Sequence, residues 1–302
     1  GNTVDEWVSK EEAHIIKGLI VGKKYKMTET KPADGYVTAE SIEFTVENTK
    51  EVQKHQMLDD VTKVEISKKD ITDSSEVPGA KLIILDKDGK KVESWTSTDK
   101  PHMVEKLPVG KYTLREEQAP DGYLIAEDVK FTVKDTGKVQ KVKMKDAHPY
   151  GKLVIKKTDS TSKAALPGAE FELREKESGK VVEKLVTDKT GTATSGKIPI
   201  ATYKNGKVEK TVEYILVETK APNGYELSSK KEEIRFEYKD GKTKVIEIVK
   251  EIKNTKSPSG STPTGNSPKT GDSTNIWLPI LLAVLSACGI GGVIWYKKKK
   301  GN

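Results

Sequence analysis

Residues 112–123 read Tyr-Thr-Leu-Arg-Glu-Glu-Gln-Ala-Pro-Asp-Gly-Tyr, and variants of this phrase occupy 25–36 and 214–225. Each copy has Tyr-x-(Leu or Met)-x-Glu, followed by a turn sequence that ends in Gly-Tyr. Because strand side chains alternate between two faces, the glutamate lies on the same face as the tyrosine and the leucine or methionine. A lone carboxylate on a core face costs several kcal/mol unless it is paired or neutral. The repeated phrase therefore predicts β-strands with a chemically unusual core.

A second polar residue follows each glutamate at a regular distance. The pairs are Glu29 with Asp59, Glu116 with Asp146, and Glu218 with Asn254. The first two pairs have the same separation, and the third is longer, which we attribute to a hairpin at Asp240-Gly241. Each of these Asp or Asn residues again shares its strand face with apolar neighbours, such as Met57 beside Asp59.

Two lysines complete the pattern. In the alternating segments 64–70 and 153–159, Lys68 and Lys157 fall on the apolar face, and a Pro-Gly-Ala phrase that starts the next strand follows each segment. Most strand lysines extend to water along their aliphatic stems. An inward lysine, glutamate and Asp or Asn, repeated in register, instead indicates a buried triad.

Such a triad has a definite chemistry. Burial disfavours charge, so a buried lysine tends to lose its proton and a buried glutamate tends to keep one. A neutral amine is a nucleophile, and a protonated carboxyl can polarise a carbonyl. The amine can attack the Asp or Asn side chain and expel water or ammonia. The amide that remains removes the burial penalty.

These motifs resemble the B-type repeat domains of Gram-positive collagen adhesins, also called SpaA-like or prealbumin-like domains. The marks are K-x-D in the first strand, Y-x-L-x-E-x-x-A-P-x-G-Y near the end and a final-strand Asn or Asp. The resemblance implies an all-β fold of tandem Ig-like or prealbumin-like sandwiches with autocatalytic isopeptide bonds. It implies that Lys68 bonds to Asp146 with Glu116 as catalyst, that Lys157 bonds to Asn254 with Glu218 as catalyst, and that Glu29 and Asp59 are the equivalents in the first repeat.

We name the expected repeats module one (1–60), module two (61–148) and module three (149–256). Too few residues precede Glu29 for module one to contain its lysine strand, and Trp7 aligns with Trp95. The sequence also begins without Met or signal peptide. We therefore take the chain as a fragment or processed product, and expect module one to be partly disordered or to present an exposed sheet edge.

The remaining residues predict a surface anchor. A Ser/Pro/Thr/Gly linker (257–271) precedes a segment (272–302) with a membrane-length apolar run at 276–296 and a tetralysine tail. One interpretation is a plain membrane anchor. However, Ser267-Pro268-Lys269-Thr270-Gly271 resembles a cell-wall sorting signal, with Ser267 in place of the usual Leu. The resemblance implies that a sortase cleaves after Thr270 and joins it to peptidoglycan, so that the protein contacts the membrane only before sorting.

Other functions have little support. The net charge of +7 comes almost entirely from Lys, and scarce Arg and aromatic residues argue against nucleic-acid recognition. The four histidines (His14, His55, His102 and His148) lack ligand spacing, so we expect surface or turn positions, no metal and no cofactor. Asp86-x-Asp88-Gly89 favours a hairpin turn over a calcium loop. Cys288 alone cannot form an internal disulfide.

The prediction is an extracellular, wall-anchored adhesin stalk that presents an N-terminal binding region away from the cell. It is not an enzyme beyond the single-turnover bond formation. The alternatives are a pilus subunit, repeats that themselves bind host extracellular matrix such as collagen, and a surface enzyme with its catalytic domain upstream. The sequence names no ligand.

Overall fold

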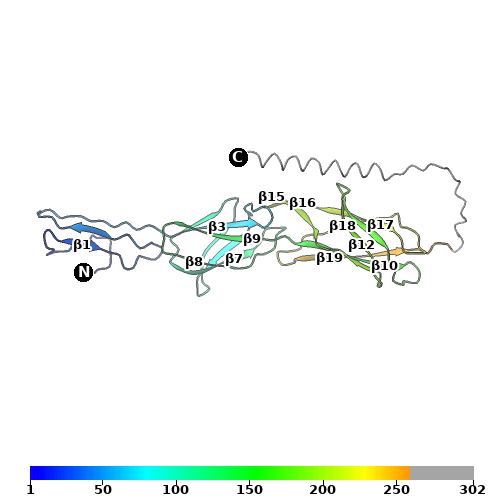
Figure 1. The fold of residues 1–302 in the computed structure, drawn as a ribbon, viewed down its shortest axis with the longest axis horizontal. Helices are drawn as coiled ribbons and strands as arrows, with labels where there is room; N and C mark the ends of the chain where they lie inside the picture. The colour runs from blue at the N-terminus through cyan, green and yellow to red at the C-terminus, as the bar shows by residue number, and fades with distance from the viewer. Residues whose placement is uncertain (259–302) are drawn as a thin grey trace, which may run out of the picture. The chain divides into compact units, whose positions relative to one another are not determined.

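The computed structural model describes residues 1–258, and every regular element there is a β-strand (Figure 1). Within this part of the chain, no helix is long and apolar enough to cross a membrane. The expected sorting motif at 267–271 and the apolar segment at 276–296 lie outside the described residues. The all-β prediction is confirmed.

Module two is built from two sheets that share one core. One sheet has the order β6-β3-β9 and the other β5-β4-β7-β8. The strands are β3 (Lys63–Asp70), β4 (Lys81–Leu85), β5 (Lys91–Thr96), β6 (His102–Glu105), β7 (Gly110–Gln118), β8 (Val129–Val133) and β9 (Val139–Asp146). Ile66 and Met144 of the first sheet pack against Ile84 and Leu114 of the second. This layering follows from the alternation of apolar and polar residues along most strands, which gives each sheet one mainly apolar face.

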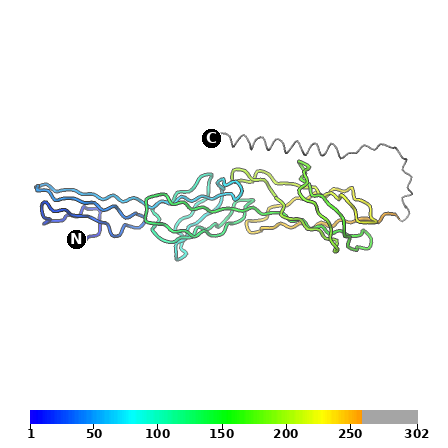
Figure 2. The backbone as a smooth tube through the Cα atoms, in the orientation of Figure 1, coloured from blue at the N-terminus to red at the C-terminus, as the bar shows by residue number. Residues whose placement is uncertain are grey.

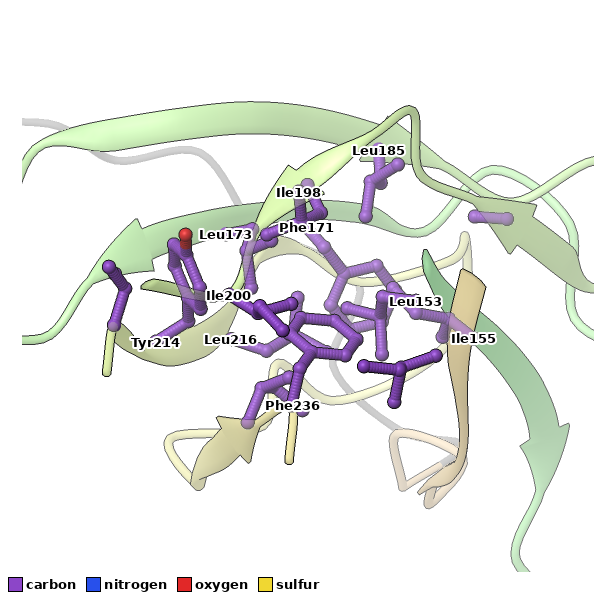
Figure 3. Close-up of a cluster of buried hydrophobic side chains, with 14 of the residues drawn as sticks. Leu153, Ile155, Phe171, Leu173, Leu185, Ile198, Ile200, Tyr214, Leu216 and Phe236 are labelled. Carbon is purple, nitrogen blue, oxygen red and sulfur yellow. The ribbon is translucent and has the colours of Figure 1, made fainter. Parts of the chain in front are cut away.

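Module three repeats the arrangement with longer connections. Its strands are β10 (Tyr150–Asp159), β11 (Glu170–Glu175), β12 (Val181–Val186), β13 (Thr192–Thr194), β14 (Ile198–Pro199), β17 (Glu213–Lys220), β18 (Lys231–Arg235) and β19 (Val245–Asn254). β10 pairs with β13, β14 and β19, and the second sheet runs β12-β11-β17-β18. Side chains from both sheets, including Leu153, Phe171 and Leu216, meet in one buried cluster (Figure 3).

In both modules the first and last strands are parallel neighbours. β3 pairs with β9 so that Asp70 faces Asp146, and β10 pairs with β19 so that Asp159 faces Asn254. Figure 2 traces the backbone, coloured by residue number, as it runs back and forth along each module. This pairing brings residues from the two ends of each module onto one sheet.

Two glycine-containing turns of module three connect their strands in different ways. Asn205-Gly206 joins β15 (Ala201–Lys204) to β16 (Lys207–Thr211) in an antiparallel hairpin without a counterpart in module two. The Asp240-Gly241 prediction is wrong as a hairpin, because β18 pairs with β17 and β19 pairs with β10. The turn carries the chain from one sheet to the other. It does lie within the longer segment that separates Glu218 from Asn254.

Module one contains only a small sheet, β1 (Lys24–Met27) paired with β2 (Ile42–Thr45). Its inward side chains are only half-buried. The prediction of a strand that buries Asp59 beside Met57 is wrong: no strand covers this segment and Asp59 is exposed. Without a lysine strand beside it, the segment gains nothing from burying a carboxylate.

Candidate cross-linking sites

The predicted triad of module two is brought together in the structure. Lys68 of β3 contacts Asp146 Oδ1 of β9, and its Nζ lies 3.0 Å from Glu116 Oε2 of β7. The three side chains are at most 1% exposed. A lysine and two carboxylates are therefore in contact in the core, shielded from bulk solvent.

Module three contains the same arrangement with an amide in place of one carboxyl. Lys157 contacts Asn254 Oδ1, and its Nζ lies 3.0 Å from Glu218 Oε1. Asn254 Nδ2 donates to Glu218 Oε1 at 3.0 Å, and Lys157 Nζ lies 5.5 Å from the Phe171 ring centroid. Again all three polar residues are buried.

Each glutamate is held in position by a backbone hydrogen bond. The N–H of Ala126 donates to Glu116 Oε2 at 2.7 Å, and the N–H of Ser228 donates to Glu218 Oε2 at 2.9 Å. A register shift in the neighbouring pairing lies beside each glutamate, where Glu117 and Thr219 are the extra residues. Bulges of this kind re-aim side chains next to functional groups. No local sequence pattern predicts these bulges.

The two sites differ in how the glutamate meets its partner. Glu116 Oε1 and Asp146 Oδ2 are buried and lack hydrogen-bond partners, whereas Asn254 donates to Glu218 at the equivalent place. Burial, reinforced by Glu116 and opposed by Lys68, raises the pKa of Asp146 to about 7. A proton shared by the two carboxyls would satisfy both oxygens.

The pKa of the lysine in module three is also shifted, in the direction that favours its reactive, neutral form. Burial lowers the pKa of Lys157, and the hydrogen bond and charge of Glu218 oppose this shift. A lower pKa increases the fraction of neutral amine, which is the nucleophilic form.

A further pair of carboxylates was not recognised as functional from the sequence. The Asp of each K-x-D motif accepts a hydrogen bond from the tyrosine of the Gly-Tyr turn, Asp70 from Tyr123 at 2.7 Å and Asp159 from Tyr225 at 2.9 Å. Burial would raise the pKa of Asp70, but hydrogen bonds from Thr72 and Tyr123 outweigh it and lower this pKa to about 2. The sequence signal that could have identified this pair is the presence of both a K-x-D motif and a Gly-Tyr turn in each of the two modules.

The equivalent residues of module one are not assembled into a site. The N–H of Ala39 donates to Glu29 Oε2 at 2.7 Å, the contact that also holds Glu116 and Glu218. However, no lysine forms an ion pair with Glu29 in residues 1–258, and Asp59 is exposed. Trp7 stacks on His14 as Trp95 stacks on His102, in agreement with the sequence alignment of the two tryptophans.

The histidines only partly follow their prediction. His14 and His55 are exposed, but the His148 side chain is 14% exposed and lies between modules two and three. Nowhere in residues 1–258 do three His, Cys, Asp or Glu side chains gather as metal ligands would. The Asp86 turn joins β4 to β5 and accepts hydrogen bonds from its own backbone, as expected of a hairpin.

Comparisons with known proteins agree with this fold. The sequence matches the family described as "SpaA: Prealbumin-like fold domain" over residues 1–60, 62–148 and 151–252. The structure is similar to the Bacillus anthracis TIE protein, with 30% identity and a TM-score of 0.50, over 78% of this chain and 42% of that one. The chain thus spans less than half of that relative. A search of curated proteins found no match.

Two pilins are more distant. A Streptococcal ancillary pilin has 17% identity and a TM-score of 0.30, covering 79% of this chain and 76% of its own. The major pilin subunit of Bacillus cereus has 16% identity and a TM-score of 0.27, covering 65% and 99%. On the family match across all three segments, the chain belongs to the SpaA prealbumin-like domain family.

Proposed function

We propose that the chain is a stalk segment of a bacterial surface or pilus protein, in which modules two and three are each closed by one isopeptide bond. It is a structural protein, and its only chemistry is a single bond-forming event in each module. The observation that carries the proposal is the pair of buried triads, Lys68 with Glu116 and Asp146, and Lys157 with Glu218 and Asn254.

The three side chains of each triad supply every group that the reaction needs. The neutral amine of Lys68 attacks the carbonyl carbon of the protonated Asp146 carboxyl, a C–N bond forms, and the bond from that carbon to the hydroxyl oxygen breaks. Glu116, 3.0 Å from Nζ, takes a proton from the amine and returns it to the leaving oxygen, so that water departs. In module three the same steps break the C–N bond of Asn254 and release ammonia. Neither step needs a cofactor or an oxidant.

The position of the bonds suits a stalk. The bond of each module joins its first strand to its last strand, β3 to β9 and β10 to β19. A pulling force that enters along the first strand then passes through the amide into the last strand. The strands between carry none of it.

The proposal also covers the attachment of the chain to the cell wall through its C-terminal residues. We infer from Ser267–Gly271 that a sortase cleaves after Thr270 and transfers the chain to peptidoglycan at the cell surface. This step rests on the sequence pattern.

Intact-mass spectrometry tests the bonds directly. The chain is expected to weigh about 35 Da less than its sequence mass, from loss of one water and one ammonia. Glu116→Ala should restore about 18 Da, Glu218→Ala about 17 Da, and the double variant the full mass. Glu29→Ala is the matched control and should leave the deficit unchanged. A full mass for the parent chain would contradict the proposal.

A further inference from the structure

We propose that the Gly-Tyr turn at the end of the repeated phrase is a socket for the following module, so that consecutive modules are held in a fixed orientation. The sockets are Gly35-Tyr36 of module one and Gly122-Tyr123 of module two. The same short phrase would then position the catalytic glutamate within a module and fix the joint to the next one. This inference does not depend on whether the isopeptide bonds form.

At the joint between modules two and three, the β15–β16 hairpin (201–211, here the strap) covers the socket. Tyr203 Oη donates to the carbonyl of Gly122 at 2.8 Å. A Cβ on Gly122 would lie 2.2 Å from Val208 Cγ2, so any larger residue there would force the Val208 side chain of the strap to move. A Cβ on Gly206 at the strap tip would lie 1.8 Å from the carbonyl oxygen of Glu76.

Aromatic packing reinforces this joint. The His148 ring stacks on Tyr203 with centroids 3.4 Å apart and planes within 3° of parallel. His148 Nε2 also hydrogen-bonds Asp70 Oδ2 at 2.9 Å, and Tyr203 packs with Val77 and Tyr123 in a small buried cluster. The strap therefore contacts the same Asp70 network that holds the end of β3.

A second contact lies beside the strap. Tyr238 Oη donates to the carbonyl of Tyr123 at 3.0 Å, and the N–H of Ile125 donates to the carbonyl of Gly241 at 2.8 Å. The Asp240-Gly241 turn, which is not a hairpin, thus lies against the socket of module two. Two separate segments of module three hold one turn, which opposes rotation about the linking peptide.

The joint between modules one and two uses the corresponding loop. The segment that leads into the glutamate strand is a short turn in module two, and its Lys106 carbonyl oxygen would lie 2.2 Å from a Cβ on Gly35. The N–H of Thr62 donates to the carbonyl of Gly35 at 3.1 Å. Thr38 donates to Asp135 through its N–H at 2.9 Å and its hydroxyl at 2.6 Å. In module three the same connection is expanded into the strap.

Module three supplies an internal control. Gly224 occupies the same position of the same phrase and has a similar backbone, with φ of +81° against +88° for Gly122. No atom of the described residues lies within 4 Å of the Cβ position of Gly224. Alanine at either glycine introduces the same backbone strain, but only at Gly122 does it obstruct a neighbouring module.

The test measures the distance distribution between modules two and three by double electron–electron resonance. Spin labels are attached to Lys111→Cys and Ser178→Cys, both exposed, in the full chain carrying Cys288→Ser. We expect one narrow distribution in this parent chain and in Gly224→Ala. Gly122→Ala and Tyr203→Ala should broaden it at least about twofold, since modules without an interlocking interface move independently.

Tyr203→Ala controls for the possibility that Gly122→Ala misfolds module two, because it alters the strap and leaves every residue of module two unchanged. A broad distribution in the parent chain would overturn the proposal. So would a narrow distribution in Tyr203→Ala, or equal broadening by Gly122→Ala and Gly224→Ala.

Discussion

At the residue scale, the two triads differ by one functional group. Asp146 and Asn254 occupy the same place beside their glutamates, but only the amide donates a hydrogen bond there. The attack on Asp146 must expel water, which requires its protonated form. Module two therefore needs one proton more than module three in its reactive state.

This difference predicts distinct pH dependences of bond formation. The pKa of Asp146 is raised to about 7, so its acid form predominates below that pH and is lost above it. The experiment starts from chain that has been kept unfolded in urea and is then diluted into buffer. The loss of about 18 Da from module two should slow above pH 7. The loss of about 17 Da from module three should not show this decline.

Asp146→Asn supplies the matched control for the pH experiment. It should convert the mass loss of module two to that of ammonia and remove the decline above pH 7. If the unchanged module two keeps a constant rate from pH 6 to about 9, the assignment of the shared proton to Glu116 and Asp146 is wrong.

The residues of both triads could be assigned to core faces from sequence because strand alternation is a local rule. Lys68, Glu116 and Asp146 could each be placed on a core face from their immediate neighbours. The roles of Asp70 and His148 could not, since both depend on residues that meet only in the folded chain. A half-buried histidine in a turn looks the same in sequence as an exposed one.

At the scale of elements, the parallel pairing of the first and last strands determines what the bonds stabilise. The strands β3 and β9 are held by backbone hydrogen bonds, and residues 78 apart would be joined by the covalent bond. Parallel pairing between distant segments carries a large entropy cost of loop closure. A cross-link removes most of that cost from the unfolded state.

Loss of a bond should therefore lower the stability of its own module. By the chain-entropy estimate, closing loops of this length contributes about 4–5 kcal/mol to the free energy of unfolding. Differential scanning calorimetry of Glu116→Ala should show module two unfolding at a lower temperature, with module three unchanged. Glu218→Ala should give the reverse pattern. Equal shifts of both transitions in either variant would show that the bonds do not act locally.

Local sequence patterns predicted the connections between strands less reliably than they predicted the strands themselves. The Asp240-Gly241 turn has the composition of a hairpin, yet β19 pairs with β10 rather than with β18. Turn composition fixes the local bend, whereas the choice of strand partner depends on the hydrophobic faces of the whole module. The bulges beside Glu116 and Glu218 escape prediction for the same reason.

At the scale of the whole molecule, the proposed bonds define how the chain responds to force. When single molecules are pulled from both ends, modules two and three should not extend, because the force path runs through the amides. The Glu116→Ala, Glu218→Ala double variant should add two unfolding steps to the force–extension trace. Full extension of both modules in the parent chain would show that the stalk proposal lacks its mechanical basis.

The family could be recognised from the sequence, but the joints between modules could not. The strap was visible only as an Asn-Gly hairpin, and nothing in its residues indicates that it packs on Gly122. Contacts between modules join segments that are each unremarkable alone, so local patterns carry little information about them.

The parallel pairing of first and last strands has one more consequence. With Lys68 joined to Asp146, the polypeptide of module two becomes a closed ring with two tails. A protease that cuts once inside this ring opens it without releasing either half, since both cut ends stay attached through the side-chain amide. The chain would stay continuous through a nick anywhere between those two residues. A stalk of such rings would survive single cleavages that sever an ordinary linear chain.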